Sequence, residues 1–314
     1  MNPIHRNFLI GSAVAIVALL PLFLGEAWTV LVVEMFVMAI AATAANLMAG
    51  YGGMVSFGLA GFYGIGAYIS ALCITKAGLP FSLAFVAGPV GGAILSIPVA
   101  WFCVRRTAIY FSMLSLAFSQ LLYVIVFTWY GFTGGDDGIV GIPIPDFLNS
   151  VRTYYYFALV VMLICLGAMW LIIRSPFGKA IQAARENAER CGFIGMNVRR
   201  YQMGIFIISS FFLSAAGALY MGLNKNAFAD YLFWAKTFDI TVTYLLGGIY
   251  SFVGPSIGAI IYILINKVIT QYTEYWPLAL GSIIVLITIF VPNGVGGYIT
   301  ERLTAARKGR EESK

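Results

Sequence analysis

Two carboxylates lie within otherwise apolar stretches and are the residues with the clearest chemical potential. Glu34 lies in the apolar segment 27–49, and Asp239 lies near the start of the segment 237–251. A carboxylate within a bilayer is costly unless it faces protein or water. We expect both side chains either to line a pathway for a polar solute or to be hydrated at the nearby ends of their segments.

Groups that could perform catalysis or bind a metal are scarce. The chain has one histidine, His5, and four cysteines without CxxC spacing, a set that predicts neither a metal site nor a disulfide framework. No phosphate-binding motif G-x-x-x-x-G-K-[ST] is present, because Gly178-Lys179 is followed by alanine. We therefore expect a protein that is not an enzyme and that binds no cofactor in this chain.

The composition indicates the elements that must position these residues. The chain has 314 residues, of which 61% are hydrophobic and 10% charged. A soluble fold could not bury so much apolar surface, so we predict an all-α polytopic membrane protein. Ten segments approach the ~20 residues that cross a bilayer, namely 8–24, 27–49, 54–75, 81–104, 108–130, 154–173, 203–223, 237–251, 254–271 and 277–293. The first is interpreted as an uncleaved span, and the glycine-dense stretch 50–70 as a region that could be broken or re-entrant.

Basic residues orient this arrangement. Most of the 19 lysines and arginines fall on one side of the ten predicted spans, which by the positive-inside rule is cytoplasmic. Both termini, the loop 174–202 and the tail 301–314 are then cytoplasmic. The net charge of +6 is explained by topology and calls for no nucleic acid. We expect one transmembrane domain over residues 1–314.

The loop 174–202 is the longest polar interruption of the chain. Ser175 followed by Pro176 predicts a helix start, and Gly192 predicts its end, which gives a helix of about four turns. Opposite charges at i,i+4 spacing are expected to pair on its surface, as Arg185 with Glu189 and Glu186 with Arg190.

Four motifs carry a resemblance to a known family. They are the loop SPFGKAIQAARENAERCGFIGMNVRRYQ, the glycine-rich segment NLMAGYGGMVSFGLAGFYGIGAY, the segment LLGGIYSFVGPSIGA and the TGGxxG of Thr133, Gly134, Gly135 and Gly138. Together they resemble permease subunits of bacterial ATP-binding-cassette (ABC) importers, specifically the branched-chain amino acid family of LivM type. The likeness extends over roughly 46–297.

The resemblance implies which residues act. The cytoplasmic loop would supply a coupling helix that docks on an ATPase subunit, with the candidates Phe177, Gly178, Lys179, Ala184, Arg185, Glu186, Asn187, Gly192 and Gly195. The translocation pathway would be lined by candidates from the carboxylates and the glycine-rich segment, namely Glu34, Asn46, Ser56, Gly58, Gly61 and Asp239.

The resemblance also implies partners, a location and a substrate. The partners are a second, LivH-type permease, two cytoplasmic ATPase subunits that bind ATP and Mg, and a periplasmic substrate-binding protein. The location is the bilayer of the bacterial inner membrane, and the substrates are leucine, isoleucine and valine. Two alternatives stay open: the same importer class acting on urea or short amides, and an ion-coupled secondary transporter that uses Glu34 and Asp239.

Two further patterns complete the interpretation. The outward loops 130–152 and 223–236 contain acidic residues and are a candidate landing surface for the binding protein. The sequences GGMVSF at 52–57 and GGIYSF at 247–252 echo one another and indicate a possible internal repeat. Both copies fall on the predicted cytoplasmic side, which a simple inverted repeat of five plus five spans would not give.

Overall fold

The computed structural model describes residues 17–21, 25–105, 108–249, 251–272, 278 and 281–282. Within these ranges the chain is mainly helical, as predicted. Most of the predicted spans 8–24 and 277–293, both termini and the tail 301–314 lie outside the described residues. The predicted total of ten spans and the cytoplasmic location of the termini therefore stay predictions.

Each of the eight apolar segments predicted between residues 27 and 271 contains a helix. Five of the described helices are long and apolar enough to cross a membrane: α2 (Glu26–Asn46, continued by the π-helix η1, Leu47–Tyr51), α4 (Phe81–Cys103), α5 (Ala108–Thr128), α7 (Val151–Arg174) and α10 (Val198–Asn224). Three more helices complete the bundle: α3 (Leu59–Thr75), α11 (Trp234–Gly247) and α12 (Gly254–Tyr272).

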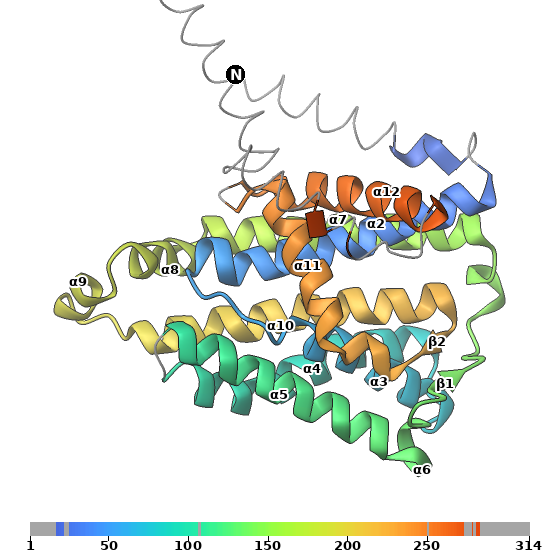
Figure 1. The fold of residues 1–314 in the computed structure, drawn as a ribbon, viewed down its shortest axis with the longest axis horizontal. Coiled ribbons are helices and arrows are strands. Elements are labelled where there is room, and N and C mark those ends of the chain that lie inside the picture. The colour runs from blue at the N-terminus through green and yellow to red at the C-terminus, as the bar shows by residue number, and fades with distance from the viewer. Residues whose placement is uncertain are drawn as a thin grey trace, which may run out of the picture.

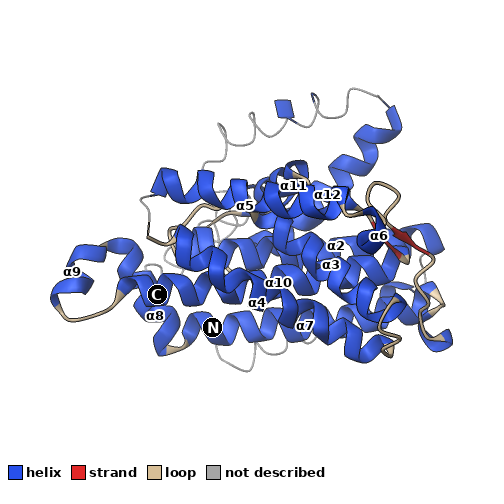
Figure 2. Ribbon diagram, turned by 90° about the horizontal axis from the view of Figure 1, so that it is seen from below, coloured by secondary structure: helices blue, strands red, loops and turns tan. Residues whose placement is uncertain are grey.

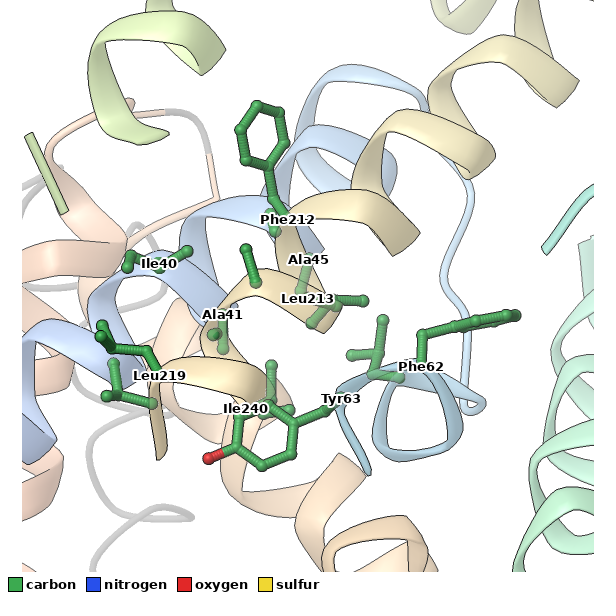
Figure 3. Close-up of a cluster of buried hydrophobic side chains, with 14 of the residues drawn as sticks. Ile40, Ala41, Ala45, Phe62, Tyr63, Phe212, Leu213, Leu219 and Ile240 are labelled. Atoms are coloured by element: carbon green, nitrogen blue, oxygen red, sulfur yellow. The ribbon is translucent and has the colours of Figure 1, made fainter. Parts of the chain in front are cut away.

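The helix α10 lies at the centre of the bundle (Figure 1). It packs against α3 and α4 on one side and against α2 on the other, and α2 in turn packs against α7, α11 and α12. Figure 3 shows the buried side chains at this centre, where Ile40 and Ala41 of α2 approach Leu213 and Leu219 of α10. The core is continuous because each central helix is apolar around most of its surface.

Glycines allow the central helices to pack closely. A Cβ added at Gly217 of α10 would lie 1.8 Å from the carbonyl oxygen of Tyr63, and one at Gly66 of α3 would lie 2.1 Å from that of Ser214. The Ser214 hydroxyl donates a hydrogen bond to Phe62 O at 2.7 Å. Small residues at such crossings are the usual means by which membrane helices approach one another.

The two ends of the bundle differ (Figures 1 and 2). One end has the short helices α8 (Pro176–Glu186) and α9 (Ala188–Phe193), and we call it the α8 end. The opposite end, the strand end, has the small elements α6 (Tyr130–Thr133), β1 (Ile139–Val140), η2 (Asp146–Leu148), β2 (Asn226–Ala227) and η3 (Ala229–Leu232). The strands β1 and β2 pair antiparallel, with Ile139 opposite Ala227. The two predicted outward loops therefore form one surface.

Candidate functional site

The glycine-rich segment breaks the helical bundle, as its composition predicts. The π-helix η1 ends at Tyr51, residues 52–58 have no helical structure, and α3 begins only at Leu59. Unpaired backbone groups within a bilayer are costly, so non-helical chain at this depth requires protein partners.

Serine side chains from α5 supply some of these partners. The Ser112 hydroxyl donates to Val55 O at 2.5 Å, and the Ser115 hydroxyl accepts from Phe57 N at 3.2 Å. The glycines of the segment lie against the same helix, since a Cβ at Gly58 would lie 2.3 Å from Ser115 O and one at Gly61 would lie 2.8 Å from Ser119 Oγ. The structure thus gives Gly58 and Gly61 a packing role, and their place in the pathway stays a prediction.

The two glycine clusters that echo one another in sequence lie in contact. Asn46 is fully buried and its side-chain amide donates to Ser251 O at 3.2 Å. A Cβ at Gly50 would lie 2.5 Å from Ile249 O. The break between η1 and α3 and the break between α11 and α12 therefore lie side by side toward the α8 end. The sequence analysis also placed the two segments on the side of the loop 174–202. These contacts do not establish the internal repeat, which stays a prediction.

Arg185 of α8 connects the loop to these breaks. Its guanidinium donates a hydrogen bond to Gly50 O. Its aliphatic stem lies over Gly53, where an added Cβ would be 2.8 Å from Arg185 Cγ. Gly53 has φ of +68°, a left-handed conformation that favours glycine. A cavity of about 540 Å³ adjoins this contact and is lined by Gly50, Tyr51, Gln182, Arg185, Glu186 and Ile249.

The prediction of one continuous four-turn helix in the loop is wrong, because the loop forms two helices. Ser175 does cap its start, since its hydroxyl oxygen accepts from Gly178 N at 3.2 Å. However, the helix ends at Glu186, and Asn187 adopts an extended conformation with φ of −157° and caps the separate helix α9 by accepting from Arg190 N at 2.9 Å. The i,i+4 pairs Arg185 with Glu189 and Glu186 with Arg190 were expected on a continuous helix, which this break interrupts.

The coupling candidates divide into buried and exposed groups. Gly178 and Ala184 are buried, and a Cβ at Gly178 would lie 2.3 Å from Ile172 O of α7. Phe177 stacks on Tyr201 with ring centroids 5.6 Å apart. These three residues position α8. The remaining candidates, Lys179, Arg185, Glu186, Asn187, Gly192 and Gly195, are exposed on the loop.

The sequence analysis did not identify the most exposed apolar residues of the loop as candidate contact residues. Phe193 is 88% exposed and Ile194 is 81% exposed, at the C-terminal end of α9. The helix α9 projects from the bundle (Figure 2). Two adjacent apolar residues within a polar, charged loop were the available signal. Exposed apolar side chains at a projecting tip are typical of a protein contact.

The two in-span carboxylates belong to one group of charges, which we call the charged cluster: Glu34 of α2, Lys236 and Asp239 of α11, and Lys267 of α12. Lys236 Nζ lies 3.7 Å from Asp239 Oδ2, and both side chains are about a quarter exposed. Tyr262 donates to Asp239 Oδ1 at 2.6 Å. Glu34 and Lys267 line a common cavity.

The surface at the strand end explains the TGGxxG motif. Gly134, Gly135 and Gly138 all have positive φ, at +81°, +57° and +65°, where a side chain would be strained. A Cβ at Gly138 would also lie 2.5 Å from Ala227 O of β2. Thr133 donates to Val126 O at 2.6 Å. The motif therefore folds a turn that joins the two outward loops.

Acidic side chains are exposed on this surface. They are Asp136, Asp137, Asp146 and Asp230. Tyr130 donates a hydrogen bond to Asp137, and this bond raises the pKa of the Tyr130 phenol above its ordinary value. Phe147 is 70% exposed beside them. A mixed acidic and aromatic surface is suited to contact with another protein.

Comparison with known proteins adds the decisive observation. The profile of a protein family described as branched-chain amino acid transport system, permease component, matches residues 28–292. The chain belongs to this permease family. No solved structure matches it.

Individual relatives of the permease agree with this family assignment. It is 26% identical over 281 residues to the high-affinity branched-chain amino acid transport system permease protein LivM of Escherichia coli K12, which covers 80% of this chain and 65% of the relative. It is 24% identical over 285 residues to LivH of Salmonella typhimurium, which covers 82% of this chain and 91% of that protein. A probable LivM of Methanocaldococcus jannaschii is 27% identical over 210 residues. The permease thus spans about two thirds of the length of its LivM relatives.

The family membership confirms the resemblance inferred from the motifs. It places the chain in a family of transport permeases, and its five long apolar helices are consistent with a multi-pass membrane protein. The chain is similar to both LivM and LivH proteins. None of these relatives assigns a role to an individual residue of this chain.

Proposed function

We propose that this permease is the membrane-spanning subunit of an ATP-driven importer of leucine, isoleucine and valine in the bacterial inner membrane. The family match supports the importer class. The geometry that supports ATP coupling is a single contact, the hydrogen bond from Arg185 of α8 to Gly50 O at the broken end of α2.

The proposed mechanism follows from this contact. The α8 end is cytoplasmic, and α9 presents Phe193 and Ile194 to an ATPase subunit. ATP and Mg bind to that subunit and its copy. When the ATPase subunits close, α8 moves, and Arg185 transmits the movement to the paired breaks near Gly50 and Ile249. The bundle then changes from outward to inward access.

The strand end is the proposed entrance. A periplasmic binding protein docks on the exposed acidic surface of the two outward loops and releases its amino acid toward the charged cluster. A second, LivH-type permease completes the pathway. Several large apolar side chains are exposed along the described helices, for example Ile109 at 73% and Ile164 at 65%, and lipid or this second subunit would cover them.

Uptake of labelled leucine tests the energy source. In cells whose ATP is depleted while respiration maintains the proton gradient, we expect uptake to stop. In cells treated with an uncoupler but supplied with ATP, we expect it to continue. The opposite pair of results would favour the ion-coupled secondary transporter. Labelled urea and acetamide, measured in parallel, test the alternative substrates.

A further inference from the structure

We propose that the charged cluster is an entry site that binds both charged ends of a zwitterionic α-amino acid. In it, Lys267 holds the carboxylate and Glu34 holds the ammonium, beside the ion pair of Lys236 with Asp239. This inference rests on the proposed function and adds to it the binding residues and the chemical reason for the substrate class.

The site lies in the outward half of the bundle. Lys236 and Asp239 occupy the first turns of α11, which directly follows η3 at the strand end. Lys267 lies near the end of α12, the helix whose start adjoins the α8 end. Glu34 lies two turns into α2, whose last residues reach Arg185. All four charges therefore lie toward the side from which a solute would arrive.

A cavity joins two of the four charges. It has a volume of about 230 Å³ and contains Glu34 from α2 and Lys267 from α12. The amide, hydroxyl and apolar groups that line the rest of it are those of Leu31, Ile263, Asn266, Thr270 and Gln271. Opposite charges, hydrogen-bonding groups and apolar walls within one cavity match an amino acid with an apolar side chain.

The two charged side chains of this cavity, Glu34 and Lys267, do not form an ion pair with each other. Among the described residues the ion pair is that of Lys236 with Asp239, so Glu34 and Lys267 share the cavity without reaching ion-pair distance of each other. A group that bears both charges can lie between them and contact each. A role limited to joining α2 and α12 would be served better by direct contact.

Aromatic rings surround the other half of the cluster. Lys236 Nζ lies 5.6 Å from the ring centroid of Tyr63 and 5.4 Å from that of Tyr220. Ring faces at this distance attract an ammonium group. The Tyr262 hydroxyl fixes the Asp239 carboxylate in place.

The balance of charge favours a zwitterion over a neutral solute. The cluster contains two cations and two anions, so its net charge is zero. Charges within a membrane protein are costly, and urea or a short amide would need none of them. A solute with one carboxylate and one ammonium would interact with both signs at once.

Photolabelling tests the site without requiring transport. The importer complex is purified from its native membranes, placed in lipid nanodiscs and irradiated with a leucine analogue that has a diazirine in its side chain. We expect adducts in peptides from α2, α11 or α12. Free leucine should displace the label, whereas leucinamide, 4-methylpentanoate and urea, each lacking one or both charges, should do so at least about tenfold less well.

Matched variants identify the residues. Glu34→Gln and Lys267→Gln should each lower labelling by about tenfold, the effect of losing one charge-assisted hydrogen bond, while Lys267→Arg should retain most of it. Glu26→Gln, a carboxylate two turns earlier on α2, and Lys76→Gln, at the end of α3, should label as the parent protein does.

Two results would overturn the inference. One is unchanged labelling of both cluster variants, and the other is displacement of the label by urea or leucinamide as effectively as by leucine. The displacement experiment uses the unaltered protein, so a variant that fails to assemble does not decide the outcome. ATP-dependent leucine uptake that persists beside either result would leave the proposed function intact.

Discussion

At the scale of single residues, Arg185 and the glycines around it connect the loop 174–202 to the helical bundle. The side chain reaches the carbonyl of Gly50 and covers Gly53, whose left-handed conformation leaves room for the arginine stem. The glycine-rich segment therefore does more than pack helices: it leaves a backbone carbonyl open to a charged side chain from α8.

Replacing Arg185 should uncouple the two parts of the transport cycle. We expect Arg185→Met to reduce leucine uptake by about tenfold, because a hydrogen bond to a charged donor contributes roughly 1.5–3 kcal/mol. ATP hydrolysis by the purified complex should persist. The control is Arg152→Met, an exposed arginine in the first turn of α7 at the other end. Uptake that stays proportional to ATP hydrolysis in Arg185→Met would contradict the coupling role.

Two glycines within long helices provide a matched test of packing. Gly217→Ala should lower the thermal stability of the purified permease, since its Cβ would meet Tyr63 O at 1.8 Å and overpacking costs typically ~1–3 kcal/mol. Gly167→Ala on α7 has nothing within 4 Å and should be neutral or stabilising, because alanine is the better helix former. Equal melting temperatures for the two variants would show that the α3–α10 crossing is not tightly packed.

At the scale of elements, the hydrophobic pattern predicts the helices well and the loops poorly. The length of the apolar segments predicted the position of every described span, and the high glycine content of residues 50–70 predicted the break before α3. The break at Asn187 was not predicted, because Asn187 lies within a run of good helix formers. Its short side chain caps α9 instead of continuing α8, a local competition that periodicity does not register.

The candidate site shows the same division. Sequence reasoning selected Glu34 and Asp239 as isolated charges in apolar segments. It did not single out Lys236 and Lys267, since their proximity to the carboxylates depends on how α2, α11 and α12 pack. Spacing along one chain does not supply this information. The sequence shows that Phe193 and Ile194 are apolar, but their exposure depends on the turn between α8 and α9.

The projecting helix α9 carries its own prediction. Ile194→Asp, placed at a side chain that is 81% exposed, should reduce the amount of ATPase subunit that co-purifies with the permease by about tenfold, the scale of loss for a central apolar contact. Ile194→Leu keeps the apolar surface and should retain the ATPase. Equal recovery of the ATPase with Asp and Leu would exclude α9 as a docking element.

At the scale of the whole molecule, the two ends present different surfaces. The α8 end presents a basic loop with an apolar tip, and the strand end presents acid and aromatic side chains on paired loops. The charged cluster and the helix breaks lie between them along the bundle. In the proposed mechanism, a solute meets the cluster before it meets the region around Arg185.

The acidic surface of the strand end predicts a salt-dependent encounter. We expect Asp136→Asn combined with Asp230→Asn to slow uptake several-fold at low salt and to have a smaller effect at high salt, since exposed charges act mainly on the association rate and are screened by ions. Initial uptake rates at two ionic strengths measure this. A deficit that is independent of salt would argue against electrostatic docking.

The most direct test of the whole account is to isolate the tagged permease from its native membranes in mild detergent and identify what accompanies it. We expect a P-loop ATPase and a second, related permease in the same complex, and leucine, isoleucine or valine in any binding protein that associates with it. Recovery of the permease alone, as a stable monomer or homo-oligomer that still takes up its solute after reconstitution, would contradict the importer function.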